Sequence, residues 1–252
     1  MVARIDRTGE ENINNFGSKM IIIKYKNAND INVLFPEYNW IAYGVQYIQF
    51  KNKNLKCPYE PRLYYVGYIG EGKYKGEVDG KLTNEYKTWA GMLKRCYCEQ
   101  QIKKDKVYVN CVVCEEWHNF QNFAEWFENN YYEIENEEMN LDKDILIKGN
   151  KIYSPNTCIF VPKRINSLFT KSNKTRGELP IGVGIKNNKF RSRCRTIYKE
   201  VYLGMFNTAE EAFNAYKTFK ENYIKQVANE YKDKIPYKLY DAMYSYEVNI
   251  ND

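Results

Sequence analysis

The sequence of 252 residues lacks any long apolar segment. No apolar run approaches eighteen residues, the length that a membrane-spanning helix requires, and the first residues lack the apolar core of a signal peptide. The sequence therefore predicts no membrane partner. We expect a soluble protein that stays in the cytoplasm.

Cysteine is present in an odd number, seven, in a chain with no signal segment. Reduced thiols or a metal site are therefore expected in place of disulfides. Zinc needs four thiolates in a tetrahedron, and the C-x-C pair has the wrong spacing and continues a predicted helix. We expect ordinary thiols, with zinc as the alternative at Cys96, Cys98, Cys111 and Cys114. The remaining three are predicted to be small core residues: Cys57, Cys158 and Cys194.

Charge is unevenly placed along the chain. Residues 163–206 hold eleven Lys and Arg against two Glu, a net charge of +9, which leaves −3 for the rest of a chain whose total is +6. This asymmetry favours a local surface for a polyanion, against the alternative of a merely solvated basic face. The middle of the chain is acidic and is a candidate surface for a protein partner: Glu115, Glu116, Glu125, Glu128, Glu133, Glu135, Glu137 and Glu138.

The N-terminal part is typical of β structure from about residue 20 to residue 70. The apolar runs "KMIIIKY" and "INVLF" are separated by the turn-forming "KNAND", "VQYIQF" alternates, and "YYVGYIGEGKY" ends in glycines. These features predict a small β module over residues 1–76.

The middle changes to a helical period. "TNEYKTWAGMLKRCY" begins with Thr83 as the predicted N-cap, and "EEWHNFQNFAEWFENNYY" carries a second apolar stripe. In "LDKDILIKGNKIYSPNTCIFVP", apolar residues flank "KGNK", which predicts a hairpin-like turn, and "SPNT" predicts a further turn. The basic "TKSNKTRGELP" at residues 170–180 is predicted to be a linker.

The C-terminal part predicts three short strands, broken at Asn187-Asn188 and near Lys199, followed by one long helix. Thr208 and Glu211 form a capping box at the start of that helix. Its predicted buried stripe is Ala212, Ala215, Tyr216, Phe219, Tyr223, Val227 and Tyr231.

Three arginines spaced two apart lie on the middle strand, with Ser192 and Cys194 between them. Because successive side chains of a strand point to opposite faces, the arginines share one face. A three-stranded sheet backed by one helix leaves that face open. A sheet face with guanidinium groups suits the major groove of DNA, where Arg binds guanine or phosphate. The predicted contacts are Arg191, Arg193 and Arg195, with Lys186, Lys189 and Tyr202 as weaker candidates.

Residues 177–232 resemble the Apetala-two/ERF (integrase-like) DNA-binding domain. Gly182-Val183, the arginine strand and "YLGMFNTAEEAFNAYK" carry this resemblance. It implies that the sheet enters the major groove of double-stranded DNA. We predict a domain at residues 177–252 and expect that fragment to fold alone.

The preceding segment is similar to an HNH (ββα-metal) endonuclease module, as in phage-encoded proteins. The resemblance implies Asp142 as a metal ligand, with Asp144 as a second candidate for Mg²⁺, and Asn150 near the middle Asn of the motif. It places Lys143 at the general-base position and Thr157 where a later Asn or His is expected. A lysine is protonated at neutral pH and is a poor base. His118, the only histidine, is predicted to be exposed on the helix before the motif.

These features together predict an α+β protein of three parts, residues 1–76, 77–169 and 177–252. The expected function is double-stranded DNA binding in a bacterial or phage-infected cell, with an HNH-like module that is catalytically degenerate and no firm cofactor. One alternative is an active Mg²⁺-dependent HNH or homing endonuclease. The other is a phage protein that acts on a host factor through the acidic middle.

Overall fold

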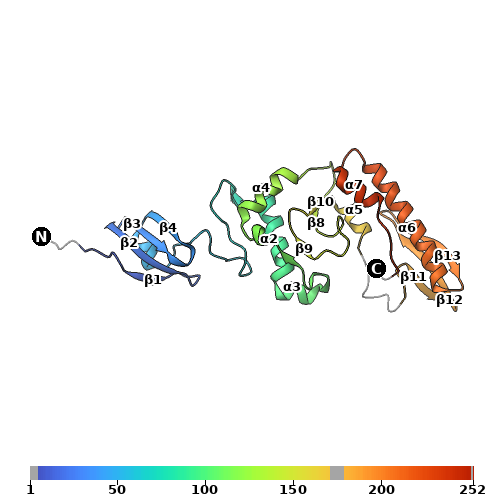
Figure 1. The fold of residues 1–252 in the computed structure, drawn as a ribbon, viewed down its shortest axis with the longest axis horizontal. Coiled ribbons are helices and arrows are strands. Elements are labelled where there is room, and N and C mark those ends of the chain that lie inside the picture. Colours follow the sequence, from blue (N-terminus) through green and yellow to red (C-terminus); the bar gives the residue numbers. More distant parts are fainter. Residues whose placement is uncertain (1–4, 171–178, 251) are drawn as a thin grey trace. The chain divides into compact units, whose positions relative to one another are not determined.

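The chain folds into two compact units, residues 1–129 and residues 130–252, in the computed structural model. The structure describes residues 5–170, 179–250 and 252. Each unit combines helices with small sheets, so the predicted α+β class is confirmed (Figure 1). The predicted central segment, residues 77–169, contributes to both units, and most of the predicted linker lies outside the described residues. The three predicted domain boundaries therefore stay a prediction.

The first unit opens with a four-stranded antiparallel sheet in the order β1-β2-β3-β4. Its strands are β1 Glu11–Ile13, β2 Lys19–Asn27, β3 Asp30–Phe35 and β4 Trp40–Val45, with the 3₁₀ turn η1 at Pro36–Tyr38. Alternate side chains of β2 and β3 are fully buried, among them Met20, Ile22 and Val33. The predictions of β2 from "KMIIIKY" and of β3 from "INVLF" are confirmed.

The prediction of β structure beyond β4 is wrong in two places. "VQYIQF" contains a short helix, α1 Tyr47–Lys51, because Gln46 and Gln49 form a capping box that closes the first turn. Phe50 is the buried anchor of this helix. In "YYVGYIGEGKY", Tyr64 and Tyr65 have positive φ values of 54° and 63°, a conformation that interrupts an extended strand.

Helix α2, Asn84–Tyr97, forms as the sequence predicts. The Thr83 hydroxyl accepts a hydrogen bond from the Tyr86 amide and so caps the helix. Trp89, Met92 and Leu93 are fully buried. The other short elements of this unit are β5 Glu77–Val78, β6 Lys81–Leu82, α3 Glu99–Lys104, η2 Lys106–Tyr108 and β7 Val112–Val113.

The second predicted helix of the middle segment is interrupted. A 3₁₀ turn, η3 Glu115–His118, is followed by helix α4, Phe120–Asn130. Asn119 separates them with extended backbone angles, and its side-chain oxygen accepts a hydrogen bond from the Gln121 amide. Asn favours such local side-chain bonds over a continuous helix, which explains the break.

The second unit begins with two antiparallel strands, β8 Met139–Asp142 and β10 Ile159–Pro162, followed by helix α5, Lys163–Leu168. The chain does turn at Lys148-Gly149, but the residues beside that turn do not form the predicted hairpin. Instead, Asp142 pairs with Ile159 across β8 and β10. The turn predicted at "SPNT" is present, and the two-residue strand β9, Ile152–Tyr153, precedes it.

The predicted three-stranded sheet is present in the order β11-β12-β13. Its strands are β11 Val183–Lys186, β12 Lys189–Arg195 and β13 Glu200–Phe206. Asn187 and Asn188 both have positive φ, 51° and 56°, as a tight hairpin turn requires. Helix α6, Ala209–Tyr231, follows with the predicted capping box of Thr208 and Glu211, and helix α7 is Tyr237–Tyr244.

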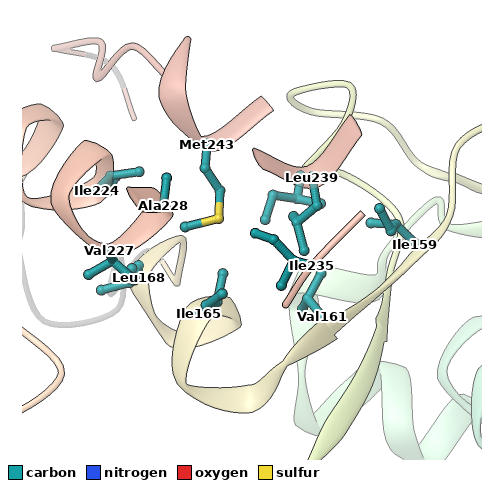
Figure 2. Close-up of a cluster of buried hydrophobic side chains, with 11 residues drawn as sticks. Ile159, Val161, Ile165, Leu168, Ile224, Val227, Ala228, Ile235, Leu239 and Met243 are labelled. Carbon is teal, nitrogen blue, oxygen red and sulfur yellow. The ribbon is translucent and has the colours of Figure 1, made fainter. Parts of the chain in front are cut away.

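Helix α6 takes part in two cores. Its N-terminal half packs through Ala212, Phe213 and Tyr216 on Val183 and Cys194 of the sheet. Its C-terminal half enters a second cluster with β10, α5 and α7, which comprises Ile145, Ile159, Val161, Ile165, Leu168, Ile224, Val227, Ala228, Ile235, Leu239 and Met243. Figure 2 shows Met243 pointing into the space between α6 and α5. The two cores make α6 a shared element of this unit.

The buried stripe of α6 differs in part from the predicted one. Ala212, Tyr216 and Val227 are buried as expected, whereas the other four predicted residues are only partly buried. Lys220 is buried instead, and this burial lowers the pKa of its ammonium group, a shift that nearby Cys194 partly opposes. Within the described ranges, no helix is both long and apolar enough to span a membrane.

Candidate functional site

The middle strand of the C-terminal sheet, β12, has two chemically different faces. Ser192 and Cys194 are 0% and 1% exposed and lie on the face that α6 covers. Arg191, Arg193 and Arg195 alternate with them and therefore point to the opposite face. Arg193 and Arg195 are exposed, and Arg191 is half-buried.

Strand register adds the three weaker candidates to the same face. Lys186 pairs with Lys189, which lies two residues before Arg191 on β12 and so shares its face. Tyr202 pairs with Arg193 and is 62% exposed. We name this set the arginine face: Lys186, Lys189, Arg191, Arg193, Arg195 and Tyr202.

A β-bulge shapes the neighbouring strand. Ser192 pairs with Gly204 while Arg193 pairs with Tyr202, so Leu203 is the extra residue of β13. Leu203 packs against the core under the sheet. The bulge therefore keeps Tyr202 outward beside Arg193 while Leu203 contributes to the core.

Most of the charge on the arginine face is available to a ligand. The Nη1 atom of Arg193 lies 3.1 Å from Oε1 of Glu200, and both side chains are about half exposed. Exposed ion pairs of this kind contribute about 0–1 kcal/mol, so the pair can exchange for a phosphate at little cost. The buried Nε of Arg191 has no hydrogen-bond partner among the described residues. The arginine face thus combines five cations with one nearby carboxylate, that of Glu200. The sequence alone did not identify Glu200 as a neighbour of this face.

One glycine, Gly182, sets the distance between the sheet and helix α6. Gly182 has φ +79°, and a Cβ there would lie 2.0 Å from Cδ2 of Tyr216. Its carbonyl accepts a hydrogen bond from the Arg193 amide at 2.9 Å. Gly184, two residues later, has open space at the corresponding position. Gly182 therefore couples the packing of α6 to the backbone of the arginine strand.

The carboxylate predicted as a metal ligand, Asp142, organises the loop after β8. Its Oδ1 atom accepts hydrogen bonds from the amides of Asp144 and Ile145, at 2.9 and 2.7 Å. Burial raises the pKa of Asp142, nearby Asp144 adds to this, and the two hydrogen bonds oppose it. These bonds turn the chain away from an extended path, which explains why "ILI" does not continue β8.

Two further residues of the HNH-like pattern, Asn150 and Thr157, donate side-chain hydrogen bonds to backbone carbonyls of the same loop. The side-chain amide of Asn150 donates to the carbonyls of Lys143 and Ile152, both at 2.7 Å. The Thr157 hydroxyl donates to the same Ile152 carbonyl at 2.7 Å. Lys143 is buried, and its Nζ lies 3.5 Å from Oδ2 of Asp144. Asp142, Asn150 and Thr157 therefore have a structural role in this loop.

We expect Asp142→Asn to keep the fold at neutral pH. An amide oxygen can accept the same two hydrogen bonds, and it carries no charge to bury. A raised folded-state pKa means that the protonated acid stabilises the fold at low pH and that this contribution is lost as pH rises through the folded pKa. Asp142→Asn should therefore equal or exceed wild-type stability at pH 7 in urea unfolding, with the advantage shrinking toward pH 3.

Asp142→Ala is the matched variant, and its free energy of unfolding should fall by about 1–3 kcal/mol because two backbone amides lose their acceptor.

Plasmid incubated with the wild type and Mg²⁺ or Mn²⁺ should stay supercoiled, since the general base of the HNH pattern is replaced by Lys143. Metal-dependent cleavage that disappears in Asp142→Asn would contradict the structural role of this carboxylate.

His118 differs from its predicted position. It lies at the end of the 3₁₀ turn η3, is half-buried, and packs edge-to-face on Tyr97 with ring centroids 6.1 Å apart. Its Nε2 atom lies 3.4 Å from the Tyr97 hydroxyl. The prediction of an exposed helical residue is wrong, because helix α4 begins only after Asn119 and the 3₁₀ turn before it places the imidazole on Tyr97 of α2.

The cysteines form no disulfide, and all seven lie within the described part of the chain. Cys57, Cys158 and Cys194 are buried, as predicted for small core residues. Of the four zinc candidates, Cys96 and Cys111 are buried and Cys98 and Cys114 are half-buried. Burial raises the pKa of the Cys114 thiol. No group of three or more His, Cys, Asp or Glu side chains in the described ranges is placed to hold a metal ion.

The acidic middle divides between the two units, with Glu115, Glu116, Glu125 and Glu128 in the first and Glu133, Glu135, Glu137 and Glu138 in the second. Three of these carboxylates already have partners within their own unit. The pairs are Glu128 with Lys73 and Tyr74, Glu137 with Arg164 and Tyr231, and Glu138 with Lys163. A protein partner at this region stays a prediction.

Comparison with protein families, with curated proteins and with solved structures gives no match for this chain.

Proposed function

We propose that this protein binds double-stranded DNA through the arginine face. The observation that carries the proposal is the common orientation of its five cations and Tyr202 on the sheet face opposite α6. β structure can enter the major groove, which is wide enough to admit a two-stranded ribbon. Arginine in that groove can bind guanine O6 and N7 with two hydrogen bonds or can hold a phosphate.

The hairpin geometry supports the same proposal. The tight turn at Asn187-Asn188 joins β11 to β12 at one edge of the sheet, with Lys186 and Lys189 paired beside the turn. Both lysines are exposed and can meet phosphate groups on the strands that border a groove. The sequence resemblance to the Apetala-two/ERF domain assigns the same surface to DNA, so the resemblance and the charge of this face favour the same ligand.

Replacing each arginine separately by alanine should weaken DNA binding and leave the fold intact. Replacement of an arginine that binds guanine should lower the binding free energy by about 1–3 kcal/mol and relax the preference at one base position. Replacement of an arginine that binds phosphate should weaken binding to all DNA sequences alike and lower the slope of log affinity against log salt concentration by about one. The measurement is binding of selected duplexes against salt concentration, together with thermal unfolding of each variant.

Phe190→Ala is the matched control on the same strand. Phe190 packs against the core under the sheet, so its loss should lower the melting temperature. At temperatures where the variant is folded, Phe190→Ala should bind DNA like the wild type. Unchanged duplex affinity in a folded variant that lacks all three arginines would disprove the proposed function.

A further inference from the structure

Helix α7 presents a row of three tyrosines. Tyr237, Tyr240 and Tyr244 are spaced by three and four residues, which places them on one side of the helix. The ring centroids of Tyr237 and Tyr240 are 6.2 Å apart, and those of Tyr240 and Tyr244 are 5.6 Å apart with planes at 26°. We name these three residues the tyrosine row.

The outer two tyrosines of this row are not needed to hold α7 on the core. Leu239 and Met243 anchor α7 in the shared core and are completely buried. Tyr240 is partly buried, and its hydroxyl donates to Asn229 at 3.0 Å. Tyr237 and Tyr244, in contrast, are 77% and 45% exposed. The two exposed rings are joined through Tyr240 into one contiguous aromatic surface, and interaction sites concentrate on contiguous apolar surface.

Lysine ammonium groups lie beside the rings. Lys225 Nζ is 5.5 Å from the ring centroid of Tyr244, and Lys232 Nζ is 5.9 Å from that of Tyr240. Lys238 is also exposed on α7. Asp241, on the same helix, is exposed as well, so the local excess of positive charge is small. The rings therefore carry most of the expected affinity, and the lysines add the charge that meets phosphate.

We infer that the tyrosine row binds single-stranded DNA by stacking of unpaired bases. Every base has a π-face that can stack on a tyrosine ring, and the phosphates between bases can meet flanking ammonium groups. Tyrosine is enriched at protein interfaces too, but a protein partner fits less well here, because lysine, which is depleted at the centre of such interfaces, lies beside two of the three rings. The inference rests on the proposed function in that DNA is the shared ligand, but it assigns a separate surface and a different form of DNA.

The test uses the full chain, a labelled oligothymidylate strand and a duplex of equal length, with binding followed by fluorescence anisotropy at low salt. Tyr237→Ala and Tyr244→Ala should each weaken single-strand binding by about 5- to 150-fold, the loss expected for one stacked base. The corresponding phenylalanine variants should bind like the wild type, because the ring is retained. Melting temperatures should be unchanged, since both side chains lie outside the core.

Two controls separate this surface from the arginine face. Tyr43→Ala removes a tyrosine that is 71% exposed elsewhere, and it should change neither binding curve. A variant lacking Arg191, Arg193 and Arg195 should lose duplex binding and keep single-strand binding. If the wild type binds only single strands and needs the tyrosine row, the inference holds and the proposed function fails. Wild-type single-strand affinity in the double Tyr237→Ala, Tyr244→Ala variant would overturn the inference.

Discussion

A fragment of residues 177–252 is expected to show no cooperative thermal unfolding, although it contains the whole C-terminal sheet and all of α6. The sequence pattern predicts that this fragment folds alone, but the shared core changes that expectation. Truncation at residue 177 removes β10 and α5 and so uncovers Ile224, Val227, Leu239 and Met243, which are 0–1% exposed. At about 1.5–3 kcal/mol for each side chain, the loss is at most roughly 6–12 kcal/mol, since α6 and α7 still pack on each other.

That loss is comparable to the whole stability of a typical domain, about 5–15 kcal/mol. The longer fragment of residues 130–252 retains both cores and should unfold in one cooperative transition. Circular dichroism on heating, with binding of a hydrophobic dye as a second probe, distinguishes the two fragments. A sharp transition for residues 177–252 with little dye binding would show that the sheet core is sufficient by itself.

The second large effect is expected at Gly182. Gly182→Ala places a methyl group 2.0–2.6 Å from ring atoms of Tyr216, in a backbone conformation with φ +79°. The positive φ costs roughly 1–3 kcal/mol for a residue other than glycine, and overpacking adds about 1–3 kcal/mol. The free energy of unfolding, measured in urea, should therefore fall by roughly 2–6 kcal/mol.

Gly184→Ala provides the matched control, because a Cβ there meets no atom within 4 Å and the backbone is extended. Its stability should stay near that of the wild type. A double-mutant cycle with Tyr216→Ala separates the two contributions at Gly182, since removal of the ring leaves only the backbone cost. A Gly182→Ala variant as stable as Gly184→Ala would mean that the helix can move away from the sheet without penalty.

The features that the sequence predicted correctly depend on neighbours within a few residues. Thr83 and Thr208 cap their helices with side-chain bonds to amides three residues later, which is a local pattern. The common face of the arginines follows from the alternation of a strand, whatever packs behind it. For this reason β2, β3, the three strands of the C-terminal sheet, the long helix and the residues of the arginine face were predictable.

The features that the sequence did not predict depend on distant parts of the chain. The buried stripe of α6 turns toward Lys220 and Ile224 because two different cores meet the helix along its length. The exposure of Tyr237 and Tyr244 depends on Leu239 and Met243 filling the same core. One error is local instead: the alternation of "VQYIQF" fits a strand, whereas the capping box of Gln46 and Gln49 closes a helical turn there.

Because α6 takes part in both cores of the second unit, we expect the two cores to unfold together. A ligand that binds only the folded sheet stabilises everything that unfolds together with it, by RT ln(1 + [L]/Kd). At a hundredfold excess over Kd this is about 2.7 kcal/mol, and through α6 it applies equally to β8, β10 and α5. Occupancy of the arginine face thus protects the loop ordered by Asp142 from every opening that also unfolds the sheet, and it leaves openings confined to the loop unchanged.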